Sequence, residues 1–255
     1  MGEPQFEVKL AETEAELLAA QRLRYAVFVD ELGGGGAMVD HDRRLETDRF
    51  DPFYDHMILI DHSRDAQALE HVVGVYRLMR AGQAAEAGGF YCESEYGLEP
   101  LKSSGRRLLE LGRSCVLPQY RGGAAMYHLW SGLAGYVEAH EIDILFGVAS
   151  FHGTDVEALA QPLSLLHHRH LAPEALRVRS HVFQPMDLIA EEALDRREAM
   201  LQVPALIKAY LRLGGVVGEG AFVDHAFNTT DICLIMETGK MNAQRRRIYA
   251  SEARA

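Results

Sequence analysis

The chain of 255 residues lacks several features that would place it in common protein classes. It has only three cysteines (Cys92, Cys115 and Cys233) and no Cys-x-x-Cys pair, which argues against a disulfide framework and against a zinc site. No apolar run approaches the roughly 20 residues that a membrane-spanning helix requires. The first seven residues have neither the basic region nor the apolar segment of an export signal. We therefore expect a cytoplasmic protein without a metal site.

Positive charge is also scarce, since the formal net charge is −11. This balance argues against nucleic acid as the main partner. The arginines that are present cluster locally, at Arg106-Arg107, Arg196-Arg197 and Arg245-Arg246-Arg247. These clusters are either solvated surface charge or contacts for an acidic partner. Hydrophobic residues make up 48% of the chain, and no repeat or linker divides it, so we predict one domain over residues 1–255.

The stretch 108–140 predicts a strand, a glycine turn and a helix. Residues 108–117 are apolar with Glu110 and Arg113 set among them, and Pro118 ends the run. Apolar residues then recur at steps of three and four up to His140. The turn between them fits Gln/Arg-x-x-Gly-x-Gly/Ala, the fixed positions being Gln119, Gly122 and Ala124. Amides of such a turn at a helix start form a nest for anions.

The other segments predict an α/β protein. We expect strands at 6–10, 56–61, 71–80, 142–150 and 232–236, and a helix that begins after a capping box at Thr13 and Glu16. Four glycines at 33–36 stop that helix and begin a loop that continues to about residue 51. Residues 81–89, rich in glycine and alanine, are expected to form another loop. The strand-helix-strand order at 108–150 predicts a parallel strand pair.

Charged residues fall at places where their charge needs an explanation. Arg24 and Phe28 lie on the first helix, Asp48 and Asp51 in the loop, and Arg77 in a predicted strand. Taken singly, Arg24 could be solvated and the aspartates could serve turns. A charge inside an apolar strand must be paired, which applies to Arg77 and to Glu110, although a purely structural ion pair would satisfy it.

Together these motifs resemble acyltransferases of the GNAT (N-acetyltransferase) superfamily. Acyl-homoserine-lactone synthases share Arg-Tyr-x-Val-Phe, paired aspartates, Gly-x-x-Arg and Glu-x-x-Arg in this order. Ornithine Nα-acyltransferases (lyso-ornithine lipid synthases) are similar over nearly the whole chain, including Glu-Leu-Gly-Arg-Ser-Cys-Val, the turn after Tyr120, 146–151 and 204–214. The lactone synthases usually carry a tryptophan after the first helix, where this chain has four glycines. The resemblance implies a GNAT-like fold, with a central mixed, mostly antiparallel sheet flanked by helices and an extended C-terminal region.

The resemblance further implies transfer of a 3-hydroxyacyl chain from acyl carrier protein to the α-amine of L-ornithine, giving lyso-ornithine lipid. Glu110 is then the candidate general base, and the candidates for acceptor binding are Arg24, Phe28, Asp48, Asp51, Arg77 and Arg113. The donor's phosphopantetheine would contact Val116 (through its N–H, at the oxyanion), Gln119, Arg121, Gly122, Gly123 and Ala124. No tightly bound cofactor is implied. Cys115 is either a nucleophile or a buried, inert thiol.

Three alternatives remain open at this point. The acceptor could be another amino acid such as glutamine, the reaction could be acyl-homoserine-lactone synthesis, or the chain could be a non-catalytic module that binds acyl carrier protein. The predicted helix at 204–213 has two interpretations as well. Its apolar residues either pack in the core or contact the inner membrane, where an amphipathic product would be released.

Overall fold

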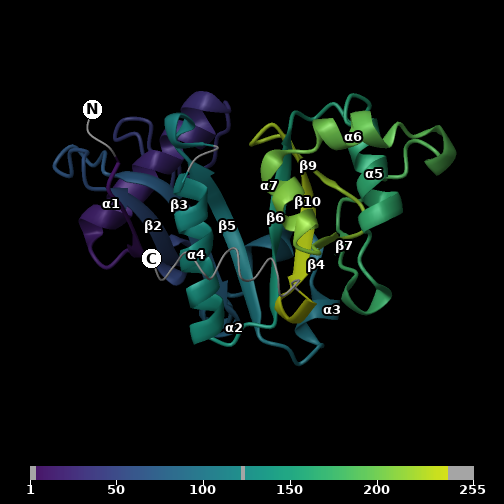
Figure 1. Cartoon of the computed structure of the whole chain (residues 1–255), viewed down its shortest axis with the longest axis horizontal. Coiled ribbons are helices and arrows are strands. Elements are labelled where there is room, and N and C mark those ends of the chain that lie inside the picture. Colours follow the sequence, from purple (N-terminus) through teal and green to yellow (C-terminus); the bar gives the residue numbers. More distant parts are fainter. Residues whose placement is uncertain (1–3, 122–123, 241–255) are drawn as a thin grey trace. The chain divides into compact units, whose positions relative to one another are not determined.

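The computed structural model describes residues 4–121 and 124–240, and the chain forms two compact units (Figure 1). Among the described residues, the first unit holds 4–88, 111–121 and 124–141, and the second holds 89–110 and 142–240. Each unit is therefore assembled from separate stretches of the chain. The expectation of one domain over 1–255 stays a prediction.

The strands of the first unit are mainly antiparallel. Strand β1 (Phe6–Leu10) pairs antiparallel with β2 (Asp55–Asp61), which pairs antiparallel with β3 (Val72–Arg80). Strand β5 (Leu108–Val116) follows β3 in the strand order, and its residues from Leu111 onward belong to this unit. These strands lie within a residue or two of the predicted ones.

The first helix begins as the sequence predicts. Thr13 Oγ1 accepts a hydrogen bond from Glu16 N–H, and the Glu16 carboxylate accepts one from Thr13 N–H, which completes the capping box before α1 (Glu14–Arg24). The helix continues as a π-helix over Tyr25–Glu31 and ends before Gly33, whose φ is +69°. The remaining helical segments of this unit are α2 (Ala81–Ala87), α4 (Ala124–Ala139) and two 3₁₀ turns, Asp51–Phe53 and Pro118–Tyr120.

Helix α2 contradicts the prediction of a loop over 81–89. Four of its seven residues are alanine, the residue with the highest helix propensity. Gly88 ends it in the left-handed conformation with φ of +82°. The glycines thus mark the end of a short helix rather than a loop.

Helices α1 and α4 cover opposite faces of the first unit's strands, because side chains alternate along a strand. Ile58 and Ile60 of β2 belong to the core cluster that contains Ala19, Ala20 and Leu23 of α1. On the other face α4 packs against β1, β2 and β3 (Figure 1).

The close packing of α4 against the strands depends on glycine. A Cβ atom on Gly132 would lie 2.4 Å from Val8 Cγ1 and 3.2 Å from Met57 Sδ. A Cβ on Gly74 of β3 would lie 2.8 Å from Leu129 Cδ1. Both positions therefore need a residue without a side chain.

The second unit is built around a long antiparallel pair. Strand β6 (Ile144–His152) pairs with β10 (Thr229–Glu237) over nine residues, and β10 also pairs with β8 (Val216–Val217) and β9 (Phe222–Asp224). The first three residues of β5, Leu108–Glu110, pair in parallel with Ile144–Phe146 of β6. The predicted parallel pair is therefore confirmed, and the mixed, mostly antiparallel pairing agrees with the predicted fold class.

The second unit also holds a short antiparallel pair, β4 (Tyr96–Gly97) with β7 (Arg179–Ser180). Its helices are α3 (Glu99–Lys102), α5 (Ala160–His170), α6 (Arg196–Gln202) and α7 (Ala205–Arg212), with 3₁₀ turns at Tyr91–Ser94, Glu174–Leu176, Glu191–Ala193 and Thr238–Lys240. Ile207 and Tyr210 of α7 are buried, which favours core packing for this helix. Within 4–121 and 124–240, no helix is both long and apolar enough to cross a membrane.

Candidate active site

Six charged side chains of the first unit form one buried ionic cluster. Three are arginines and three are carboxylates, so their formal charges cancel. Five of them were expected to bind the acceptor; the sixth, Glu46, was not. The cluster consists of Arg24, Glu46, Asp48, Asp51, Arg77 and Arg113.

Arg24 lies at the centre of this cluster with no exposed side-chain surface. Its Nη1 and Nη2 donate to the two oxygens of Asp51 at 2.7 and 3.2 Å, and its Nε and Nη2 contact Oε2 of Glu46. Fork-to-fork contacts of this kind match the planar guanidinium to the carboxylate. The alternative that Arg24 is a solvated helix residue is therefore wrong.

Arg77 is also fully buried, and it joins the two aspartates. Its Nη1 lies 2.7 Å from both Asp48 Oδ2 and Asp51 Oδ1, and its guanidinium carbon lies 4.3 Å from the centre of the Tyr54 ring. The charge inside β3 is thus compensated by residues of the glycine-containing loop. This explains how an arginine can occupy an apolar strand.

Arg113 completes the cluster from β5. Its Nε donates to Glu46 Oε1 at 3.1 Å, and its Nη2 lies 3.4 Å from Asp48 Oδ2. Its backbone φ is +46°, a conformation that a non-glycine residue adopts only at a cost. The Phe28 ring centre lies 6.0 Å from its guanidinium carbon. The strained backbone therefore places Arg113 between Phe28 and the carboxylates.

Burial by itself would raise the pKa of each of the three carboxyl groups. The neighbouring arginines reverse this effect, so the pKa values of Glu46, Asp48 and Asp51 lie below their usual range. The opposing charges of Arg24 and Arg77 hold the pKa of Asp51 lowest, well below the ordinary value. All three groups are ionised at neutral pH.

Two polar residues that were not predicted as site residues support Asp51. Gln21 Nε2 donates to Asp51 Oδ2 at 3.0 Å, and His56 Nε2 lies 3.0 Å from the Asp51 carbonyl oxygen. The carbonyl accepts, so His56 is an Nε2–H donor. Burial lowers the pKa of His56, which keeps it neutral beside Arg77, its cross-strand partner. Glu46 begins the same sequence pattern as Asp48 and Asp51, but no role was predicted for it.

The predicted donor turn is described up to Arg121, while Gly122 and Gly123 lie outside the described residues. Val116 is buried at the end of β5, Gln119 is exposed, and Ala124 begins α4. Arg121 donates from Nε to the Val116 carbonyl oxygen at 2.9 Å. A strand end, a short turn and a helix start thus follow one another as the sequence predicts.

Glu110 belongs to the second unit and is 1% exposed. Its two carboxylate oxygens accept hydrogen bonds from the backbone N–H groups of Tyr91 and Cys92, at 2.9 and 2.8 Å. These bonds fix the carboxylate at the start of the 3₁₀ turn Tyr91–Ser94. Its proposed role as a base stays a prediction.

The three cysteines are buried and form no disulfide. Burial raises the pKa of Cys115 to about 12 and that of Cys92 well above its usual value. A thiol in this state is a poor nucleophile. This supports the interpretation of Cys115 as a buried, inert thiol.

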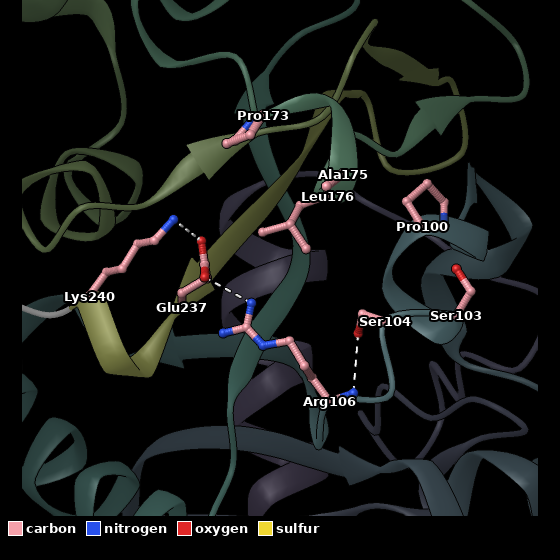
Figure 2. A pocket seen from close by; sticks show the side chains of 9 residues that line it. All are labelled: Pro100, Ser103, Ser104, Arg106, Pro173, Ala175, Leu176, Glu237 and Lys240. Carbon is pink, nitrogen blue, oxygen red and sulfur yellow. Dashed lines mark hydrogen bonds and ion pairs between the residues drawn. The ribbon is translucent and has the colours of Figure 1, made fainter.

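The second unit contains a hollow of about 460 Å³, between α3, the turn Glu174–Leu176 and the end of β10 (Figure 2). Glu237 projects into it and pairs with Arg106 at 2.8 Å and with Lys240 at 2.5 Å. Arg107 has a carboxylate partner as well, Asp143. The Arg106-Arg107 pair therefore serves local ion pairs, and no predicted site residue within the described ranges lines the hollow.

Comparisons with known proteins agree with this architecture. Residues 23–131 match the model of the acetyltransferase (GNAT) domain. An N-acyl amino acid synthase from uncultured soil microbes has a TM-score of 0.53 at 13% identity, with 92% of each chain covered. The AHL synthase LasI has a TM-score of 0.52 at 15% identity, with 97% of this chain and 96% of that one covered. Similarity at this level shows a common fold, which is the predicted GNAT-like one.

Sequence similarity to two proteins extends over nearly the whole chain. A protein of Rhodobacter capsulatus named L-ornithine N(alpha)-acyltransferase is 64% identical over 244 residues, which cover 96% of this chain and 94% of that protein. A protein of Brucella abortus with the same name is 42% identical, with 97% and 89% covered. The chain therefore belongs to the L-ornithine N(alpha)-acyltransferase family and is an N-acyltransferase of the GNAT-like fold.

Proposed function

We propose that this enzyme transfers a 3-hydroxyacyl chain from acyl carrier protein to the α-amine of L-ornithine and so forms lyso-ornithine lipid. The observation that supports ornithine as the acceptor is the 64% identity, over nearly the whole chain, to a protein named for ornithine acylation. The donor and the 3-hydroxyacyl chain rest on the resemblance of the motifs. Phosphopantetheine on the carrier protein is the only prosthetic group that the reaction needs.

The reaction is aminolysis of a thioester. The α-amine nitrogen attacks the carbonyl carbon, the C–S bond breaks, and the pantetheine leaves as a thiolate that takes up a proton. The amine must lose a proton before or during the attack, and a carboxylate can accept it directly or through a water. Glu110 is our candidate, because it is a buried carboxylate on β5, the strand that ends just before the predicted donor turn. The buried, poorly acidic thiol of Cys115 favours direct transfer without an acyl-enzyme.

Exposure divides the ionic cluster into two layers. Arg24, Arg77, Glu46 and Asp51 expose 6% of their side chains or less, whereas Asp48 exposes 17% and Arg113 exposes 13%. We therefore assign contact with the acceptor to Arg113, for its α-carboxylate, and to Asp48, for its side-chain ammonium. In this proposal the more deeply buried residues Arg24, Arg77 and Asp51 hold the side chains of Arg113 and Asp48 in place.

The donor side uses the end of β5 and the turn that follows it. We assign the N–H of Val116 to the developing oxyanion, where a fixed backbone donor stabilises charge in the transition state. Gln119, Arg121 and Ala124, with Gly122 and Gly123, form the turn that we expect to receive the pantetheine arm. Amides at a turn before a helix suit an anionic group.

The proposal is tested by supplying the purified enzyme with a 3-hydroxyacyl thioester of acyl carrier protein and one amino acid at a time. We expect thiol release and N-acylation with ornithine, and much slower reaction with glutamine or other amino acids. Release of thiol with glutamine but not with ornithine would show that glutamine is the acceptor and would overturn the proposal for ornithine. Consumption of S-adenosylmethionine would indicate lactone synthesis instead.

Replacement of Glu110 tests the mechanism separately from the acceptor. E110Q keeps an acceptor oxygen for one of the two backbone amides but cannot accept the ammonium proton, so we expect kcat to fall by about 10²-fold or more. E93Q is the matched control, because Glu93 belongs to the same 3₁₀ turn and its carboxylate accepts a hydrogen bond from Phe90 N–H. Equal rates of thiol release for E110Q and the wild type would remove Glu110 from the mechanism.

The proposed product is amphipathic, and we expect the enzyme to release it at the inner face of the cytoplasmic membrane. Ile207 and Tyr210 of α7 are buried, so we assign this contact to apolar side chains that are exposed elsewhere in the second unit. The large apolar side chains that the second unit exposes within its described residues are Val182, Phe183, Leu188 and Leu201. Sedimentation with vesicles of phosphatidylethanolamine and phosphatidylglycerol, for the wild type and for V182S/L201S, tests this contact.

A further inference from the structure

The side chain of Arg121 is held by three hydrogen bonds inside the first unit. Its Nη1 and Nη2 donate to the two oxygens of Glu31 at 2.6 and 2.7 Å, and its Nε donates to the Val116 carbonyl oxygen at 2.9 Å. The hydrogen bonds to Arg121 lower the pKa of Glu31, and the same pair raises the pKa of Arg121. A bidentate pair with a third bond to the backbone fixes both the position and the plane of the guanidinium.

Glu31 is the last residue of the π-helix that follows α1. That helix carries Phe28, and Gly33 follows Glu31 by two residues with φ of +69°. The Glu31–Arg121 pair therefore connects the end of the first helix to the turn after β5, across 90 residues of chain. π-helical segments occur often at functional sites.

A second contact fixes the neighbouring residue of the turn. Tyr120 Oη donates to Asp61 Oδ2 at 2.7 Å, and the other oxygen of Asp61 accepts from the N–H groups of Gln5 and Ser63. Leu117 N–H donates to the Val73 carbonyl oxygen at 2.9 Å. Three contacts thus hold the end of β5 and the first part of the turn in place.

We propose that Glu31 is a positioning residue for donor binding. It holds Arg121, and through Arg121 it holds the Val116 peptide and the beginning of the turn in the geometry that receives the thioester. The resemblance implied that Arg121 contacts the donor's phosphopantetheine, for which a direct bond to the phosphate would be the simplest form. The geometry instead gives Arg121 an internal role. This inference rests on the proposed function, because it requires that the turn binds the donor.

The two roles of Arg121 predict opposite effects of E31Q. If Arg121 meets the phosphate directly, Glu31 competes for it, and E31Q releases the guanidinium and lowers the donor KM. If Glu31 positions Arg121, the neutral side chain weakens the pair, and the donor KM rises. Both side chains are partly exposed, at 34% and 42%, so we expect a rise of about two- to fivefold.

The matched control is E219Q. Glu219 pairs with Arg179 in the second unit at 2.7 Å, and its exposure of 31% is close to that of Glu31. We measure KM for acyl carrier protein thioester, KM for ornithine, kcat and Tm in both variants. The expected result is a raised donor KM in E31Q alone, with an unchanged ornithine KM and equally small changes in Tm.

Exchange of the two charges gives the decisive comparison. In E31R/R121E the ion pair is rebuilt with reversed polarity, but a glutamate at position 121 has no hydrogen to donate to the Val116 carbonyl oxygen. Donor KM should therefore recover only in part relative to E31R alone. A direct phosphate contact predicts the reverse, because the exchange removes the cation from position 121.

The outcomes separate this inference from the proposed function. An unchanged or lowered donor KM in E31Q, with normal ornithine acylation by the wild type, overturns the positioning role and leaves the function intact. A wild type that neither binds the donor thioester nor releases thiol overturns the proposed function, and this inference with it.

Discussion

Replacement of Asp51 by asparagine tests whether the ionic cluster holds the first unit together. Asp51 accepts hydrogen bonds from Gln21, Arg24 and Arg77, all at 3.2 Å or less. Asparagine keeps the shape and one acceptor oxygen, but its amide hydrogens would face donors. The cluster would also change from neutral to a net positive charge, since three arginines would share two carboxylates.

The size of the effect follows from burial. Arg24 and Arg77 have no exposed side-chain surface, so water cannot replace the lost carboxylate. Removal of one partner from a buried ion pair typically costs about 3–5 kcal/mol. Domains of this size are stable by about 5–15 kcal/mol, so a loss of about 3–5 kcal/mol in D51N is a fifth or more of the free energy of unfolding.

The assay is urea-induced unfolding at pH 7 followed by far-UV circular dichroism. The control is D30N, which removes the carboxylate of an exposed Asp–Arg pair, Asp30 with Arg44. Exposed pairs contribute about 0.2–1 kcal/mol, so D30N should be nearly neutral. If D51N and D30N lost the same free energy of unfolding, the cluster could not be a major source of stability.

The dependence of the unfolding free energy on pH is a second measurement, and its expected direction follows from the pKa of Asp51. The pKa of Asp51 is lower in the folded chain than its unfolded value of about 3.9, so its contribution is fully present above that value. As the pH falls below about 4 toward the folded pKa, the contribution is lost. The difference in unfolding free energy between wild type and D51N should therefore shrink in acid.

Three further predictions concern packing, protonation and thiol reactivity. G132A should destabilise the protein by about 1–3 kcal/mol, because its Cβ meets Val8. G135A, in an open part of the same helix, should stabilise it by up to about 1 kcal/mol. Thermal unfolding of both variants measures these changes, and equal shifts in Tm would contradict the prediction. Since burial lowers the pKa of His56, the folded state loses stability as the pH falls below about 6.5. H56Q keeps a donor for the Asp51 carbonyl and should weaken the dependence of the unfolding free energy on pH, measured by urea unfolding. An unchanged dependence would assign it to other groups. Cys115, with its pKa raised to about 12, should resist iodoacetamide at pH 8 until the chain is unfolded, as mass spectrometry would show, and rapid labelling of the native protein would refute its burial.

The sequence by itself determined the elements whose signals are local. The capping box at Thr13 and Glu16, the strand 6–10 and the strand-turn-helix around residue 119 all depend on neighbours a few positions apart. The motifs also identified five of the six members of the ionic cluster. Short segments rich in alanine and glycine were less certain, because such composition suits both a loop and the helix α2.

Only the tertiary structure decided which charges meet and which remain exposed. Arg24 reaches Glu46 across 22 residues, and Arg113 reaches the same carboxylate across 67. Pairing of strands and closure of the loop bring these side chains together, and no local pattern encodes the distances between them. The same is true of Arg121, whose partner Glu31 lies 90 residues away. The sequence gives the residue types. The charge state and the role of each residue depend on its burial and its partners, because these are set by contacts between distant segments of the chain.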